Sequence, residues 1–186
     1  MLVRSRNIKA SVNVSSVLNS VSLVASWGQV KPALKIISGG QTGVDRAALE
    51  WALAKRFPHG GWCPKGRRAE DGIIPPLFQL TETGSADPVI RTHRNVKDSD
   101  GTVIFSQGER LSGGTAETAR FAREIGKPLL HLTADTKADA AARQLGAFLV
   151  EHGITALNVA GPRESEEPGV GPFVHVVLTL ALCITR

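Results

Sequence analysis

Short apolar segments alternate with segments of helical periodicity from residue 33 onward. Residues 33–38 form an apolar run that ends at Gly39-Gly40, which predicts a buried strand. From Val44 the apolar positions recur at the spacing of one helix face, to about Lys55. Pro58 and the two glycines that follow it end this predicted helix.

The same alternation continues to the end of the chain. Further strands are expected at 78–83, 102–105, 129–133 and 154–159, and helices at 92–98 and 115–125. Thr136 and Asp139 resemble a capping box that opens another helix, which Gly153 ends. The segment 172–183 is apolar all round and indicates a buried helix, although its β-branched residues leave a strand possible. Residues 60–76 are expected to form a long loop.

Strands separated by helices predict an α/β fold. We expect a Rossmann-like, doubly wound, mostly parallel sheet of about five or more strands with helices on both faces. In such sheets ligands bind at the carboxyl ends of the strands, where the strand order reverses.

Three glycine-rich turns follow predicted strands, at 38–45, 112–118 and 160–165. Parallel strands bring all three to one edge of the sheet. A glycine turn that opens a helix offers free N–H groups to an anion, although a single such turn is often a plain connection. Together they predict a phosphate site, and its candidate residues are Gly39, Gly40, Gln41, Thr42, Gly113, Gly114, Thr115, Gly161 and Arg163.

The loop from Trp62 to Gly72 places three cations beside two acids. Lys65 and Arg67 could neutralise a second phosphate, and the alternative is a solvated charge cluster. Cys63 could bind a soft metal but fits a small buried hydrophobe better.

Two carboxylates are the candidates for catalysis. Asp45 lies in the first turn of its helix, where it could compensate the helix dipole or bind a ribose, an amine or a metal-bound water. Glu117 could act as a general acid or base. Arg91 could reach the same pocket as Arg163. The five histidines show no metal-ligand spacing, so no metal site is expected.

Charge and composition exclude several classes of function. Residues 1–35 carry five basic side chains and no acid, whereas the rest of the chain carries 17 basic and 17 acidic residues. The basic pI therefore belongs to the N-terminal segment, which argues against a nucleic-acid partner. No apolar run is long enough to span a membrane. The two cysteines fit a cytoplasmic location. We expect residues 1–32 to be an extension, with a targeting segment as the alternative, and residues 33–186 to form a single domain.

The segment from Ile37 to Leu49 (ISGGQTGVDRAAL) resembles the signature of the molybdenum-cofactor carrier family. Later pieces agree: GWCPKGRRAEDG at 61–72, RTHRNV at 91–96, DSDGT at 98–102, GGT at 113–115 and LNVAGPRES at 157–165. The resemblance covers the chain from about residue 34. It implies a Rossmann-like fold and a phosphorylated ligand, either molybdenum cofactor or a nucleotide phosphate.

The resemblance extends to the lysine-decarboxylase-like phosphoribohydrolases, which cleave nucleotides. Their Pro-Gly-Gly-x-Gly-Thr-x-Glu-Glu motif corresponds here to residues 112–118, where the second glycine and the paired glutamates are missing. We therefore expect a binding or carrier protein for a small phosphorylated ligand, with a nucleotide hydrolase as the alternative. The apolar C-terminal segment suggests a homo-oligomer, a dimer or tetramer.

Overall fold

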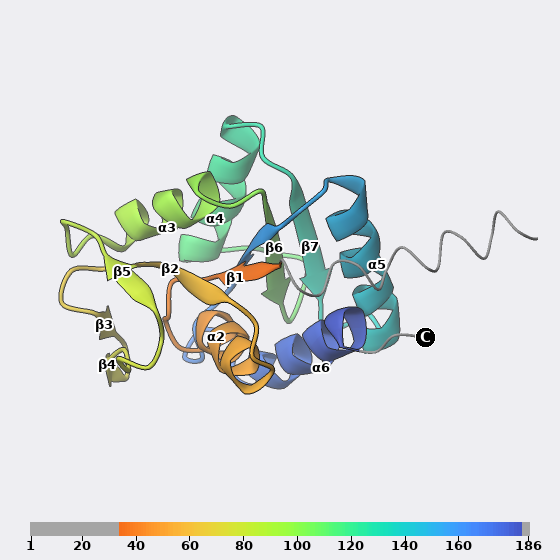
Figure 1. The fold of residues 1–186 in the computed structure, drawn as a ribbon, viewed down its shortest axis with the longest axis horizontal. Helices are drawn as coiled ribbons and strands as arrows, with labels where there is room; N and C mark the ends of the chain where they lie inside the picture. The colour runs from red at the N-terminus through yellow and green to blue at the C-terminus, as the bar shows by residue number, and fades with distance from the viewer. Residues whose placement is uncertain (1–33, 184–186) are drawn as a thin grey trace, which may run out of the picture.

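The computed structural model describes residues 34–183, and its centre is one six-stranded sheet (Figure 1). Every neighbouring pair of these six strands is parallel, in the order β5-β2-β1-β8-β6-β7. The strands are β1 (Lys35–Ile37), β2 (His59–Cys63), β5 (Leu80–Glu82), β6 (Gly101–Ser106), β7 (Leu129–Thr133) and β8 (Ala156–Ala160). The α/β class predicted from the sequence is confirmed.

Helices cover both faces of the sheet. They are α2 (Val44–Ala54), α3 (Pro88–Lys97), α4 (Gly113–Glu124), α5 (Ala138–Glu151) and α6 (Val170–Leu182). Helix α6 packs between α2 and α5 on one face, whereas α3 packs against α4 on the other (Figure 1). All six residues of β6 are buried, as expected of an inner strand covered from both sides.

The strand order reverses in the middle of the sheet, although all of the strands stay parallel. From β1 the chain proceeds to β2 and β5 on one side, and from β6 to β7 on the other. Strand β8 returns last and inserts between β1 and β6. The carboxyl ends of β1, β8 and β6 therefore border the crevice in which ligands of open α/β sheets bind.

Strand β2 was not expected from the sequence. Four of its five residues, HGGWC, lie inside the predicted long loop, and the segment lacks an apolar run. The strand forms because β1 and β5 pair with it on either side, so its backbone hydrogen bonds are satisfied despite two glycines. The same loop also contains a short antiparallel hairpin of β3 (Arg68–Ala69) and β4 (Gly72–Ile73).

Helices α3, α4 and α6 begin two to four residues before their predicted starts, and α5 differs in its cap. Helix α5 has Lys137 at its N-cap with no side-chain hydrogen bond, so the capping box of Thr136 and Asp139 is wrong. Helix α3 begins at Pro88, four residues before the predicted start. There the Asp87 carboxylate accepts a hydrogen bond from the Val89 N–H at 2.9 Å.

The apolar C-terminal segment is a helix, and its buried face belongs to the protein's own core. Val174, Val177 and Leu178 are fully buried in the larger apolar cluster, together with Trp51 of α2 and Leu145 of α5. This segment thus gives no independent reason for self-association, and the homo-oligomer stays a prediction. Within residues 34–183, none of the helices is long and apolar enough to cross a membrane.

Cys63 packs as a small hydrophobe. It is fully buried in a second apolar cluster with Leu49, Ile74 and Phe78. Burial raises the pKa of its thiol, which favours the unreactive protonated form. The predicted extension, residues 1–32, lies outside the described residues.

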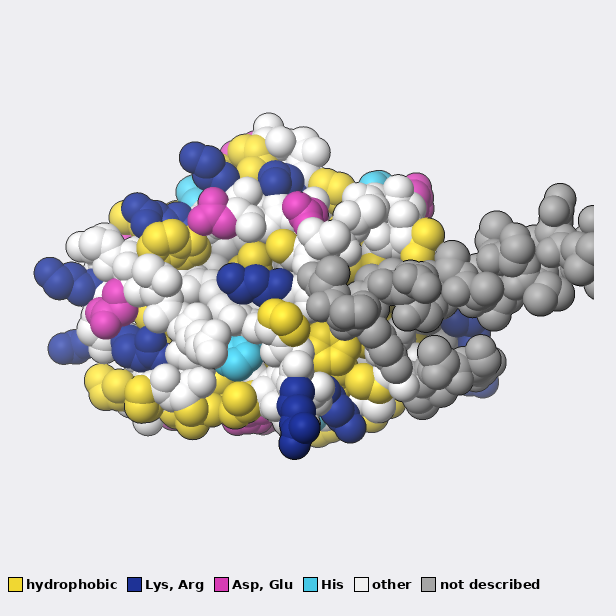
Figure 2. Space-filling model, viewed as in Figure 1, with side chains coloured by type: hydrophobic (Ala, Val, Ile, Leu, Met, Phe, Trp, Pro, Cys, Tyr) yellow, Lys and Arg dark blue, Asp and Glu magenta, His cyan; other side chains and the backbone are white. Residues whose placement is uncertain are grey.

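Basic side chains do not gather on the face seen in Figure 2. Lys and Arg residues are scattered over it, and Asp and Glu residues lie among them.

Candidate ligand-binding site

A cavity of about 280 Å³ opens at the carboxyl edge of the sheet. This volume is close to the lower end of small-molecule sites, which run from about 300 to 1,000 Å³. The loop after β1, the loop after β8, and helices α3 and α4 form its walls. The lining residues are Gly39, Gln41, Asp45, Pro88, Val89, Arg91, Thr92, Asn95, Gly113, Gly114, Thr115, Glu117, Thr118, Asn158, Ala160, Gly161, Arg163 and Glu166.

The second glycine turn contributes the uncapped start of α4. Ser112 occupies the N-cap in an extended conformation, and its side chain makes no capping hydrogen bond. The first N–H groups of a helix have no acceptor inside the helix, so those of Gly113, Gly114 and Thr115 are available at the cavity wall. A Cβ on Gly114 would have no atom within 4 Å, because the space in front of it is open.

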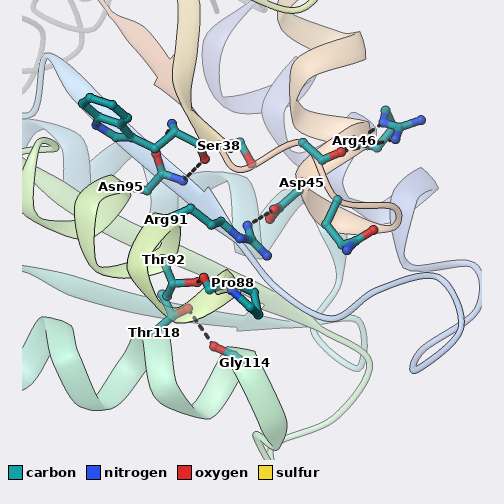
Figure 3. A network of polar contacts seen from close by, with 12 residues as sticks. Ser38, Asp45, Arg46, Pro88, Arg91, Thr92, Asn95, Gly114 and Thr118 are labelled. Atoms are coloured by element: carbon teal, nitrogen blue, oxygen red, sulfur yellow. Dashed lines mark hydrogen bonds and ion pairs between the residues drawn. The ribbon is translucent and has the colours of Figure 1, made fainter. Parts of the chain in front are cut away.

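A buried ion pair forms the opposite wall (Figure 3). Nη1 of Arg91, from α3, donates to Oδ2 of Asp45 at 2.7 Å, and the two side chains are 15% and 6% exposed. Asp45 lies in the first turn of α2. Nε of Arg91 is buried and has no hydrogen-bond partner among the described residues. The pair therefore leaves polar capacity unused beside the cavity.

The third glycine turn brings a second arginine. Gly161 lies in close contact with the Phe105 carbonyl, to which a Cβ would come within 2.3 Å. Arg163 lines the cavity, and its guanidinium makes no hydrogen bond or salt bridge with the described residues, although it lies close enough to Glu70 for their charges to interact. Glu166 lies nearby and accepts a hydrogen bond from the Arg163 N–H at 3.1 Å.

Glu117 lines the cavity but already has partners. Its carboxylate accepts hydrogen bonds from Arg120 and contacts Nε2 of His93 at 2.7 Å. The hydrogen bonds from Arg120 and His93 hold the pKa of Glu117 below its ordinary value. Glu117 is therefore an ionised carboxylate at neutral pH, which suits a general acid poorly.

The first glycine turn divides into two parts. Gly39 and Gln41 line the cavity, whereas Gly40 and Thr42 do not. The Gly40 carbonyl accepts from the Arg46 guanidinium at 3.2 and 3.3 Å, and Gly40 has a φ of 77°. The Thr42 hydroxyl donates to Glu70, at the tip of the β3–β4 hairpin.

Glu70 connects the first and third glycine turns. It accepts from the hydroxyls of Thr42 and Ser165, and its own N–H donates to Oε1 of Gln41 at 2.9 Å. The hydrogen bonds from Ser165 and Thr42 lower the pKa of Glu70. The neighbouring Asp71 forms a forked ion pair with Arg46 at 3.0 and 3.2 Å. The hairpin tip thus holds two loops of the site in register.

The structure places Lys65 and Arg67 away from the cavity. The Arg67 guanidinium donates to four backbone carbonyls, those of Ile74, Pro75, Phe78 and Leu80, at 2.9–3.1 Å. Four of the five N–H donors of this guanidinium are therefore used to fix the loop. The Lys65 side chain is exposed and makes no contact that links it to the cavity.

Several lining residues were not singled out from the sequence. Asn158, on β8, is 2% exposed and donates to the Thr102 hydroxyl at 3.2 Å. A polar residue in the middle of a buried parallel strand was the sequence signal that could have identified it. Glu166 lies among other acidic residues of its loop, so nothing in the sequence distinguished it. Within residues 34–183, no group of three His, Cys, Asp or Glu side chains could hold a metal ion.

Comparison with known proteins places the chain in a family. A solved structure from Syntrophus aciditrophicus SB, described as a "Putative molybdenum carrier protein", is 46% identical and superposes with a TM-score of 0.79, over 82% of this chain and 98% of that chain. An (E)-4-hydroxy-3-methyl-but-2-enyl diphosphate reductase shares 12% identity at a TM-score of 0.34, over 89% and 64% of the two chains, which is too distant to carry an argument. No curated protein matches the chain. The sequence profile of the circularly permutated YpsA SLOG family matches residues 36–182, and the chain therefore belongs to that family.

Proposed function

We propose that this protein binds and carries a small phosphorylated, nucleotide-like ligand in the cavity at the carboxyl edge of the sheet. The observation that carries the proposal is the combination, in one cavity, of the uncapped start of α4 with the guanidinium of Arg163, which makes no hydrogen bond or salt bridge with the described residues. The ligand's phosphate would lie on the N–H groups of Gly113, Gly114 and Thr115.

Electrostatics supports an anion at this position. The N-terminus of a twelve-residue helix carries partial positive charge, and its free N–H groups point along the helix axis toward the ligand. Gly114 has no side chain to block the approach. Arg163 supplies a full positive charge and a forked donor. Glu166 opposes the anion, so we expect it to weaken binding rather than to assist it.

The carrier role is supported by the relative from Syntrophus aciditrophicus, whose description names a molybdenum carrier. Molybdenum cofactor bears a phosphate and would use the same α4 subsite. A nucleotide phosphate would use it equally, because backbone N–H groups recognise the phosphate and not the group attached to it. The ligand is thus proposed by its phosphate, with molybdenum cofactor as one member of the class.

Binding is better supported than hydrolysis. A nucleotide hydrolase of the phosphoribohydrolase type would need a group that donates a proton to the leaving base. Glu117 has a lowered pKa and three hydrogen bonds from basic side chains, and Asp45 is held by Arg91. Glu117 therefore lacks the raised pKa that such a general acid needs, and the carboxylate of Asp45 is already engaged by a guanidinium.

Mass spectrometry of the small molecules that co-purify with the protein, followed by calorimetry with the identified compound, tests the proposal. If none co-purifies, inorganic phosphate and a panel of nucleoside monophosphates are the probes. We expect Arg163→Gln to weaken binding about ten- to a hundredfold, the effect of one charge-assisted hydrogen bond. Lys65→Gln is the matched control and should bind like the wild type. Turnover of the monophosphates, or an unchanged affinity in Arg163→Gln, would contradict the proposal.

A further inference from the structure

We infer that the Asp45–Arg91 pair binds the vicinal hydroxyl groups of a sugar ring, so that the ligand is a pentose phosphate or contains one. This inference rests on the proposed function, because the phosphate of the same molecule would occupy the start of α4. It adds the chemical class of the group next to the phosphate. The contacts of the pair, the polarity of the walls and the charge balance support it.

The walls of the cavity favour hydrogen bonding over stacking. None of the described residues that line it is aromatic, so a flat heterocycle finds no ring to stack on. Thr92, Thr115, Thr118 and Asn158 supply hydroxyl and amide groups instead. A ligand surrounded by such side chains must itself carry many donors and acceptors, as a sugar does.

The Asp45–Arg91 pair has one acceptor and one donor group to spare. The contact between Nη1 and Oδ2 uses a single oxygen of the carboxylate and a single nitrogen of the guanidinium. No other described residue hydrogen-bonds to either group. Nε of Arg91 is closed off from solvent, so the groups open to a ligand are the second carboxylate oxygen of Asp45 and the outer nitrogens of the guanidinium. One hydroxyl of a vicinal diol can donate to the free carboxylate oxygen while its neighbour accepts from the guanidinium. Both capacities are then used by one ligand fragment.

Charge balance indicates that the fragment at this wall is neutral. Asp45 and Arg91 compensate each other, and their side chains are only 6% and 15% exposed. A charged ligand group against this pair would be buried without a counter-ion, which is costly. A hydroxyl satisfies the remaining hydrogen bonds without adding charge. The anionic part of the ligand is thereby directed to α4 and Arg163.

Equilibrium binding of ribose 5-phosphate, 2-deoxyribose 5-phosphate and inorganic phosphate tests this inference on the intact wild-type chain. We expect ribose 5-phosphate to bind about ten- to a hundredfold more tightly than its 2-deoxy analogue, which lacks one hydroxyl of the diol. The 2-deoxy compound should bind much like inorganic phosphate. This comparison changes the ligand and leaves the protein untouched, so it is independent of any folding defect.

A pair of variants then assigns the effect to Asp45. In Asp45→Asn we expect the preference for ribose 5-phosphate over the 2-deoxy compound to disappear. Asp139→Asn breaks another Asp–Arg pair, the exposed one with Arg143 on α5, outside the cavity, and should keep the preference. Equal wild-type affinities for the three probes would overturn the inference and leave the proposed phosphate site intact. Failure of all three probes to bind would overturn both the inference and the proposed function. A preference that survives in Asp45→Asn would overturn the inference alone.

Discussion

Gly39 and Arg91 fit together only because Gly39 has no side chain. A Cβ on Gly39 would lie 1.8 Å from Nη1 of Arg91 and 2.8 Å from Oδ2 of Asp45. The sequence assigned Gly39 to phosphate binding through its N–H group. The structure shows a different consequence of the glycine, which is that it leaves room for an arginine from α3 to reach the first turn of α2 (Figure 3).

We expect Gly39→Ala to disrupt the site more than the fold. The methyl group would displace the flexible end of Arg91, which leaves the Asp45 carboxylate buried without its partner and costs about 1–3 kcal/mol. Chemical denaturation would measure that loss, and calorimetry should show at least tenfold weaker binding of ribose 5-phosphate. Gly108→Ala is the control, because a Cβ there has no atom within 4 Å. Wild-type binding by Gly39→Ala would show that the position of Arg91 is irrelevant to the site.

Arg163 and Glu166 should have opposite effects on anion binding. Removal of the cavity-lining cation in Arg163→Gln should weaken inorganic phosphate binding. Glu166→Gln removes a charge of the same sign as the phosphate and should strengthen binding about two- to fivefold. Salt should reduce the difference between the two variants, because both groups are solvent-accessible. Competition binding at low and high ionic strength measures both effects. A weaker affinity in Glu166→Gln would mean that this carboxylate contacts the ligand as an acceptor.

Arg67 should matter for stability and not for binding. Lysine cannot reproduce the planar fork that donates to four carbonyls, so Arg67→Lys should lower the free energy of unfolding by about 2–3 kcal/mol. The ligand affinity of the folded variant should equal that of the wild type. Urea denaturation and calorimetry measure the two quantities separately. If binding fell while stability stayed constant, Arg67 would neutralise a phosphate of the ligand, as the sequence suggested.

Glu70 makes stability depend on pH at the acidic end. Its pKa is lower in the folded protein than in the unfolded chain, because Ser165 and Thr42 hydrogen-bond to its ionised form. Its stabilising effect is therefore complete above the unfolded pKa, about 4.3, and is lost as the pH falls through the folded value. The stability difference between wild type and Glu70→Gln should shrink over that interval in denaturant titrations. Glu50→Gln, an exposed change on α2, should show no such trend.

The sequence determined the fold class and the edge of the sheet that carries the site. Apolar runs and helical periodicity are local signals of burial, and they identified five of the six strands of the sheet and all five helices, with shifted boundaries. Because parallel strands all point the same way, the turns that contain Gly39, Gly113 and Gly161 had to meet at one edge. This conclusion required no knowledge of side-chain contacts.

Tertiary structure decided which polar residues meet. Asp45 and Arg91 are 46 positions apart and pair only because α3 and α2 approach the same crevice. Strand β2 depends on neighbours on both sides, which no local pattern of its own residues could reveal. Arg67 looks like a free cation in the sequence and donates to four backbone carbonyls in the fold. Charge and residue type are properties of the chain, whereas the partner of each charge is a property of the packing.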